Sequence, residues 1–264
     1  MLSGPWVYLV ALVAAFVIAA LASPAGVSGA VLLLPFQVSV LGTPSPAVTP
    51  TNLLYNIVAT PGALYRYWRQ HQTGGSLTRV LLVGTIPGVV AGAIVRVEFL
   101  PSPRAFDVVI AAVLIPLGVW ILVSSREPPA ALAKYTPPLG PGVLTLLAAG
   151  VGCVGGIYGI GGGSILAPVL IGSGRSPTEV APATLASTFV TSIAGVITFV
   201  ILSTRHAAPV APDWGVGLAL GLGGLLGGYT GARLQPHLPE TAIRRLLGVL
   251  VLAIGLRYAW LAVG

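Results

Sequence analysis

The sequence predicts an all-α integral membrane protein of two inverted repeats of about five membrane passages each, with broken or re-entrant glycine-rich segments meeting near the midplane. Three observations lead to this fold class. First, hydrophobic residues make up 55% of the 264 residues and charged residues only 7%, whereas soluble domains carry about 25% charged residues. The other two are a pattern that recurs at a constant spacing and the distribution of basic residues between the loops.

The recurring pattern relates the two halves of the chain at a constant offset of 133 positions. Gly26, Gly29 and Pro35 recur as Gly159, Gly162 and Pro168. The same offset relates Pro44 to Pro177, Thr51 to Thr184, Gly62 to Gly195, Gly84 to Gly217, Gly88 to Gly221, Pro103 to Pro236 and Asp107 to Glu240. We therefore predict an internal duplication, with a first transmembrane repeat at 1–125, a Pro-rich linker at 126–140 and a second repeat at 141–264.

In the first half, an apolar stretch at 5–22 is close to the roughly 20 residues that a spanning helix needs. Ser23 and Pro24 interrupt it, and a shorter apolar segment follows at 26–41. Ala20-Leu21-Ala22 has the form of a signal-peptide cleavage site, but residues 1–4 lack the usual positive charge, so we expect a retained membrane helix. Further helices are predicted at 48–67, 77–97 and 106–123.

The second half repeats this scheme around the glycine tract at 155–164. Two short apolar segments, at 142–153 and 160–171, flank the glycine tract. Neither is long enough to span comfortably, which favours a re-entrant or discontinuous arrangement. Helices are then predicted at 183–202, 216–234 and 243–263.

The basic residues favour an inverted relation between the halves. If each half has five passages, nine Lys and Arg residues fall on one side of the membrane and four on the other. If each broken segment counts as one passage, the division becomes seven against six. Because cytoplasmic loops carry the excess of positive charge, the first arrangement is preferred, with both chain ends outside the cytoplasm.

The two breaks are the candidate ligand site. Irregular backbone at bilayer depth survives only where protein or a water-filled cavity surrounds it, and a helix that restarts there directs its first amides at an anion. Close helix packing is the alternative explanation for the glycines. The predicted substrate-binding residues come from the breaks and from the helices that follow them: Gly26, Ser28, Gly29, Thr51, Asn52, Asn56, Gly161, Gly162, Gly163, Ser164, Thr184, Ser187 and Thr188.

Several other classes of site are excluded. A single cysteine, Cys153, rules out an intramolecular disulfide or a cysteine zinc site. Gly26-Val27-Ser28-Gly29 has the GxSG form of serine intramembrane proteases, but the three histidines lie in polar loops, so no general base is expected beside Ser28. We predict no enzyme activity, cofactor, metal or nucleic-acid partner.

Charged residues inside the predicted spans are few. Arg96, Asp107, Arg205 and Arg257 lie near predicted helix ends and are expected to reach the interface or to pair there. A proton- or cation-coupling site built on a buried carboxylate is therefore not visible. The net charge of +7 is interpreted as a topology signal.

Together these motifs resemble the sulfite exporter TauE/SafE family. The resemblance rests on Gly26-Val27-Ser28-Gly29 with Pro35, on Gly159 to Ser164 with Pro168, and on the Thr51-Asn52 and Ala183-Thr184 pairs of the next helices. The first motif departs from the family pattern at Ala25 and Ser28. The resemblance implies a multi-pass carrier of the bacterial or archaeal inner membrane that exports sulfite or organosulfonates such as sulfoacetate, with coupling to the proton gradient.

Three alternatives to such an exporter remain. A passive anion channel would share the anion site, and so would a carrier for another small anion. A membrane scaffold would not require a duplicated polar break. The sequence predicts the lipid bilayer and a small anion as partners and makes no prediction of an oligomeric state.

Overall fold

The computed structural model describes residues 6–44, 47–71, 75–100, 103–124, 140–173, 175–205 and 210–263, and every regular element in these residues is a helix. The predicted linker at 126–140 lies outside the described residues apart from Gly140. The long helices are α1 (Trp6–Ala22), α3 (Val48–Arg69), α4 (Gly75–Glu98), α5 (Pro103–Ser124), α7 (Pro141–Tyr158), α9 (Pro177–Ser203), α10 (Trp214–Leu234) and α11 (Glu240–Val263). Shorter elements are η1 (Ser23–Ala25), α2 (Ala30–Phe36), the π-helical turn η2 (Gln37–Leu41), α8 (Gly161–Gly172) and η3 (Gln235–His237).

Local sequence signals explain where several of these helices begin. Proline occupies the first turn of α7 and α9, where its missing N–H removes no helical hydrogen bond. The Ser176 hydroxyl accepts a hydrogen bond from the Glu179 amide at 3.3 Å, and the Asp213 carboxylate accepts one from the Val216 amide at 3.0 Å. These two side chains are N-caps of α9 and α10.

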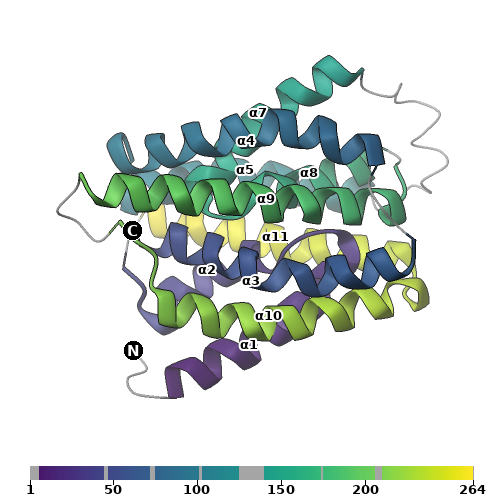
Figure 1. The fold of residues 1–264 in the computed structure, drawn as a ribbon, viewed down its shortest axis with the longest axis horizontal. Helices are drawn as coiled ribbons and strands as arrows, with labels where there is room; N and C mark the ends of the chain where they lie inside the picture. Colours follow the sequence, from purple (N-terminus) through teal and green to yellow (C-terminus); the bar gives the residue numbers. More distant parts are fainter. Residues whose placement is uncertain are drawn as a thin grey trace.

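Helix α4 packs along α7 through glycines (Figure 1). A Cβ atom on Gly84, Gly88 or Gly92 would lie 2.0–2.3 Å from the carbonyl oxygens of Thr145, Ala149 and Cys153 respectively. Both series rise by four residues at each step, so α4 and α7 run in parallel with their backbones in contact. Such contact is possible only where the facing residue lacks a side chain.

Helix α1 packs along α10 in the same way. Cβ atoms on Gly223, Gly227 and Gly231 would lie 2.0–2.4 Å from the carbonyl oxygens of Leu12, Phe16 and Ala20. We call the α4–α7 and α1–α10 contacts the two seams. The contacted carbonyls of α7 follow those of α1 by 133 positions, but the glycines of α10 follow those of α4 by 139. The contact equivalent of Gly84 is therefore Gly223, and the sequence match with Gly217 was wrong. The loop before α10 is longer than the loop before α4, which accounts for the shift.

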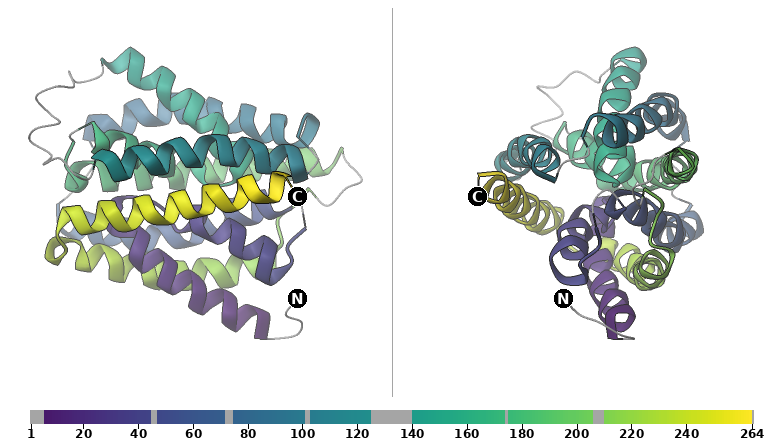
Figure 2. Two further views of the ribbon diagram at one scale, coloured as in Figure 1. Left: turned by 180° about the vertical axis from the view of Figure 1, so that it is seen from behind. Right: turned by 90° about the vertical axis from the view of Figure 1, so that its left-hand side faces the viewer.

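The remaining long helices complete the bundle. Helix α3 packs against α9 and α10, α4 also packs against α9, and α5 and α11 lie side by side (Figure 2). Cβ atoms on Gly217 and Gly221 would meet Leu54 and Val58, so α3 and α10 run in parallel. Helix α1 begins and α11 ends at the same end of the molecule (Figure 1).

Five described helical segments are long and apolar enough to cross a membrane: 6–25, 75–98, 141–158, 178–203 and 214–237. Helix α7 was expected to end near Cys153, but it continues through two glycines to Tyr158 and is long enough to span. The continuation is possible because Gly152 and Gly156 pack directly against the backbone of α4. The break in the second half is therefore confined to Gly159 and Ile160.

Candidate functional site

Each break begins with a glycine in the left-handed conformation. Gly26 (φ 72°) ends η1 and Gly159 (φ 76°) ends α7, a backbone conformation that other residues rarely adopt. The chain then turns back as α2 in the first half and as α8 in the second. This confirms the prediction from sequence that a glycine marks a helix break in each half.

Side chains from elsewhere in the fold cover the carbonyl groups around both breaks. Tyr67 donates to Ser23 O at 3.1 Å, Gln235 to Pro24 O at 2.6 Å, Thr184 to Gly26 O at 3.0 Å and Asn52 to Ala30 O at 2.9 Å. Tyr158 donates to Val31 O at 3.0 Å, Thr49 to Ile157 O at 3.3 Å and Ser164 to Ile160 O at 3.0 Å. The Ser23 carbonyl also accepts from the Gly26 amide at 2.9 Å, and each of the others gains a side-chain donor. The acceptor groups at the breaks are thus committed to the protein.

A chain of polar contacts joins the two breaks. The Ser28 amide donates to the Ser164 hydroxyl at 3.4 Å, and the Ser28 hydroxyl donates to Asn56 Oδ1 at 2.5 Å. The Ser164 hydroxyl lies 3.4 Å from the hydroxyl of Thr188. All four side chains are at most 3% exposed. The two 3.4 Å contacts are longer than ordinary hydrogen bonds, so little energy opposes their exchange for another partner.

The other predicted residues are buried as well, but not all of them meet at this junction. Asn52 braces α2, since its Oδ1 also accepts from Gln37 at 2.9 Å. The Ser187 hydroxyl lies 3.0 Å from that of Thr85 on α4. Thr51 lies apart from the junction, because its hydroxyl donates to Ala47 O at 2.7 Å and accepts from the Asp213 amide at 2.8 Å.

The five predicted glycines all pack closely in this conformation. A Cβ on Gly26 would lie 2.6 Å from Ala181 Cα, one on Gly29 2.5 Å from the Tyr55 hydroxyl, one on Gly161 3.0 Å from Thr188 Cγ2, one on Gly162 2.6 Å from Thr85 Cγ2 and one on Gly163 1.8 Å from Thr184 O. A cavity of about 10 Å³ remains beside Ser28 and Gly29. That is space for about one water molecule, so an anion of four or more heavy atoms requires the helices to separate.

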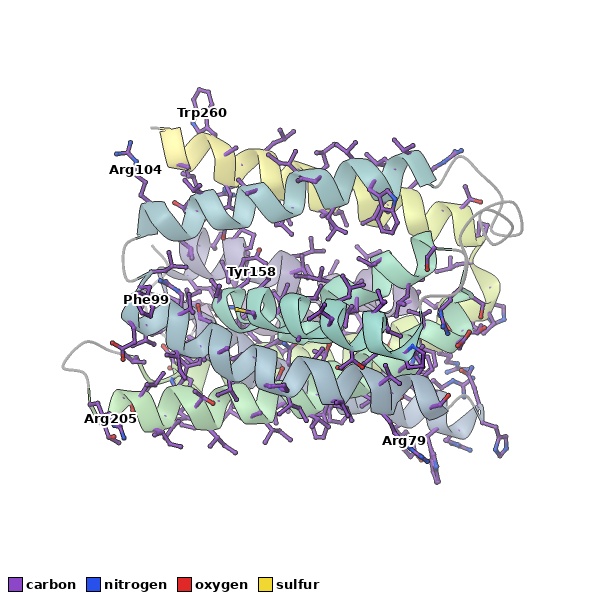
Figure 3. All side chains as sticks on the ribbon, turned by 90° about the horizontal axis from the view of Figure 1, so that it is seen from above. Arg79, Phe99, Arg104, Tyr158, Arg205 and Trp260 are labelled. Carbon is purple, nitrogen blue, oxygen red and sulfur yellow. The ribbon has the colours of Figure 1, made fainter. Side chains whose placement is uncertain are left out.

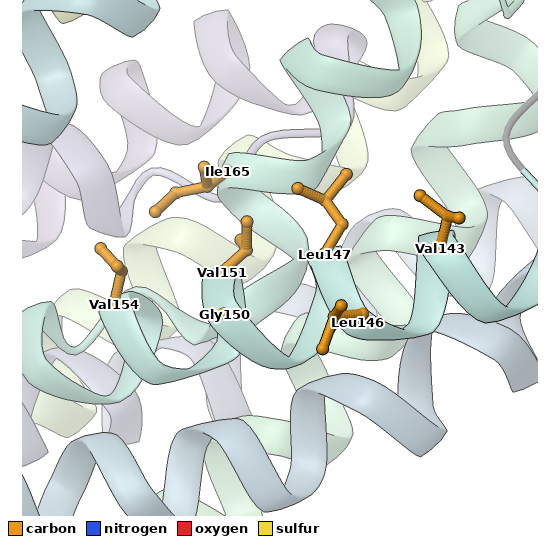
Figure 4. Close-up of a pocket in the computed structure, with 7 residues that line it drawn as sticks. All are labelled: Val143, Leu146, Leu147, Gly150, Val151, Val154 and Ile165. Carbon is orange, nitrogen blue, oxygen red and sulfur yellow. The ribbon is translucent and has the colours of Figure 1, made fainter.

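A groove of about 480 Å³ on α7 does not suit an anion (Figure 4). It is lined by Val143, Leu146, Leu147, Gly150, Val151 and Val154 of α7 and by Ile165 of α8. None of these side chains carries a hydrogen-bond donor. Among the residues that the structure describes, no group of three His, Cys, Asp or Glu side chains is placed to hold a metal ion either.

Arg96 was expected to reach the interface or to pair there, and its side chain is instead buried within the fold. Arg96 is 0% exposed and donates to Leu100 O and, at 3.5 Å, to the Thr49 hydroxyl. The side chain turns inward to reach Thr49 at the start of α3. Through Thr49, Arg96 supports the carbonyl end of α7 at Ile157.

Thr85 and Ser192 are two polar residues near the breaks that sequence reasoning missed. Thr85 stands alone in the apolar stretch of α4, and no pattern in the sequence marks it. Ser192 continues the series of Thr184, Ser187, Thr188 and Thr191 at helical spacing, and this periodicity could have identified it.

With this geometry established, the chain was compared with known proteins. It matches the family described as Sulfite exporter TauE/SafE over residues 11–258. The chain belongs to the TauE/SafE family. Its members are membrane transporters, and the chain is a multi-pass membrane protein.

Relatives of this TauE/SafE chain carry names of the same kind. A protein of Xylella fastidiosa strain 9a5c named "Probable membrane transporter protein" is 23% identical over 240 residues, covering 89% of this chain and 88% of its own length. A Bacillus subtilis strain 168 protein named "Probable membrane transporter protein YunE" is 26% identical over 191 residues and 67% of each chain. No solved structure matches the chain.

Proposed function

We propose that this TauE/SafE chain is a secondary transporter that exports sulfite or organosulfonates such as sulfoacetate across the inner membrane by alternating access. The observation that carries the proposal is which hydrogen-bonding groups of the breaks are left unpaired. Their carbonyl groups accept hydrogen bonds from side chains, while amides at the start of α8 and the Asn56 amide nitrogen are left to face a ligand. Such a site offers donors, which suit an oxyanion and repel a cation.

The packing supports two inverted repeats. Helices α1, α3 and α10 run in parallel, as do α4 and α7, and α3 and α4 are consecutive helices that run in opposite directions (Figure 1). Helix α1 is thus opposed to its counterpart α7, and α4 to α10. In each seam a helix of one half packs on a helix of the other.

The basic residues support the same arrangement. Arg104 and Arg205 lie at one end of the bundle and Arg79 at the other, as Figure 3 shows. These are the positions that the inverted topology assigns, with the richer basic set in the cytoplasm. In such a fold the two breaks meet near the midplane, and rocking of the repeats exposes them to each side in turn.

The proposed anion site is the junction of the breaks and of the helices behind them. It comprises Gly26, Ser28, Gly29, Asn52, Asn56, Gly161, Gly162, Gly163, Ser164, Thr184, Ser187 and Thr188. The site holds no fixed positive charge, so binding remains weak enough for release on the far side. Among the described residues, no Asp or Glu is buried. Coupling to the proton gradient is therefore proposed from the family alone.

The test is flux of labelled sulfite into proteoliposomes with and without a pH gradient, with sulfoacetate and other sulfonates as competitors. A coupled exporter gives saturable, gradient-sensitive flux and counter-transport. Flux that saturates weakly, without counter-transport, identifies a passive channel. If no sulfur oxyanion moves and another small anion does, the family's substrate does not apply to this chain.

A further inference from the structure

Besides the acceptor oxygens of Gln37 and Gln235, two buried polar atoms near the breaks have no hydrogen-bond partner in the described structure. They are the amide nitrogen Nδ2 of Asn56 on α3 and the hydroxyl Oγ of Ser192 on α9. Both side chains are 0% exposed. Buried polar groups are nearly always paired, and an unpaired one is costly to keep, so each such atom calls for an explanation.

The hydrogen bonds of Ser28 determine which way the Asn56 amide faces. The Ser28 hydroxyl oxygen accepts from the Ala30 amide at 3.1 Å and is 2.5 Å from Asn56 Oδ1. Because the amide oxygen of Asn56 can only accept, the Ser28 hydroxyl donates its hydrogen to it. The Asn56 nitrogen, which can only donate, is therefore directed away from Ser28.

Ser192 differs from the other buried hydroxyl residues of its helix because its hydroxyl has no partner of any kind, whereas Ser187 and Thr188 lie beside Thr85 and Ser164. Thr191 and Thr198 each donate to the carbonyl four residues earlier, at 2.7 and 2.8 Å. Such bonds satisfy a hydroxyl inside an apolar environment. Ser192 makes no such bond, and its hydroxyl is left free to serve a ligand.

The free hydroxyl of Ser192 lies at the beginning of α8. It is 3.2 Å from the position that a Cβ atom on Gly161 would take, and Gly161 is the first residue of this 12-residue helix. The first amides of a helix have no acceptor within it, and they carry the positive end of its dipole. A hydroxyl donor and a set of amide donors thus converge from α9 and α8.

We propose that Ser192 is a substrate-binding residue, whose hydroxyl donates to the same oxyanion that the first amides of α8 and Asn56 Nδ2 bind. This inference rests on the proposed function and extends its site by one residue. It assigns the orphaned donors a partner, namely an oxygen of a small sulfur oxyanion. The second half then contributes amides and a hydroxyl, and the first half contributes a carboxamide.

The test compares Ser192→Ala with Thr191→Val in the purified full-length protein. Thr191 is the adjacent residue, is also 0% exposed, and bonds its own backbone at Ser187 O, so it is a matched control. The measurements are the KM for sulfite flux in proteoliposomes and the increase in Tm that saturating sulfite produces. We expect Ser192→Ala to raise KM about tenfold and to reduce the sulfite-induced increase in Tm, because one donor to the anion is lost. Without sulfite its Tm should be unchanged or higher, since an unpaired buried hydroxyl has been removed. Thr191→Val should keep KM within about twofold.

Each other outcome overturns a defined part of the reasoning. If wild-type protein responds to sulfite and Ser192→Ala responds equally, the orphaned hydroxyl serves the fold or a buried water, and the assignment of Ser192 is refuted alone. If both variants raise KM equally, the effect is general to α9 and the assignment also fails. If wild-type protein neither transports nor is stabilised by sulfite, sulfoacetate or sulfate, the proposed function fails together with this inference.

Discussion

Replacing Tyr158 by Phe should destabilise the fold through one carbonyl group. Pro35 has no backbone N–H, so the carbonyl of Val31, four residues earlier in α2, loses its helical partner. The Tyr158 hydroxyl donates to that carbonyl at 3.0 Å, across the two halves of the chain. Tyr158 is 1% exposed and Val31 3% exposed, so water cannot replace the hydroxyl.

The magnitude follows from the burial. An unsatisfied buried carbonyl costs about 1–3 kcal/mol. For a chain of this size, 1 kcal/mol shifts Tm by roughly 2–4 °C. Tyr158→Phe should therefore lower Tm by about 2–12 °C, measured by thermal unfolding of the detergent-solubilised protein. Insertion into the membrane should be unchanged.

A double-mutant cycle with Pro35→Ala isolates the cause. Alanine at position 35 restores an N–H that can bond to Val31 O, so the Tyr158→Phe penalty should fall by at least about 1 kcal/mol in that background. Other effects of losing the hydroxyl are common to both backgrounds and cancel. An equal penalty in both would show that the Val31 carbonyl is not what Tyr158 satisfies.

Two further substitutions test the site and its boundary. Gly162→Val should reduce transport at least tenfold while the protein still inserts, because a Cβ there would lie 2.6 Å from Thr85 Cγ2. Gly142→Val, where a Cβ meets nothing within 4 Å, is the control and should transport normally. Full activity of Gly162→Val would show that the start of α8 is not part of the site. Thr51→Val should lower Tm by about 3 °C, because the hydrogen bond from the Asp213 amide is lost, and should leave the KM for sulfite within about twofold of the wild-type value. A tenfold rise in KM would show that Thr51 does belong to the anion site.

The positions of the breaks could be predicted from the sequence because a local signal marks them. Gly26 and Gly159 adopt positive φ, which glycine permits, and they recur at one offset. The partners that cover the breaks had no such signal. Gln235 is 211 residues from the carbonyl of Pro24 that it binds, and only the folded arrangement of α10 and α1 brings them together.

Arg96 and the glycines of α10 show how tertiary packing overrides local expectation. Arg96 lies two residues from the end of its helix, where a long side chain ordinarily reaches the interface. Arg96 is instead buried and contacts Thr49 of α3, 47 residues away, which no local pattern reports. Gly217 and Gly223 both lie on α10, and sequence matching chose Gly217, which faces α3, whereas Gly223 faces α1.

The polarity of a break is decided by which of its backbone groups the rest of the fold satisfies. A broken helix exposes carbonyls where it ends and amides where it restarts, so a break can serve either a cation or an anion. Here the carbonyls of Ser23, Pro24, Gly26 and Ile157 are each bound by a side chain from another helix. A cation would have to displace these donors, whereas an anion would replace the 3.4 Å contact between the Ser28 amide and the Ser164 hydroxyl once the helices separate. Under the proposed function, selectivity for anions is thus set by residues far from the breaks in sequence, which cover backbone acceptors and leave donors free.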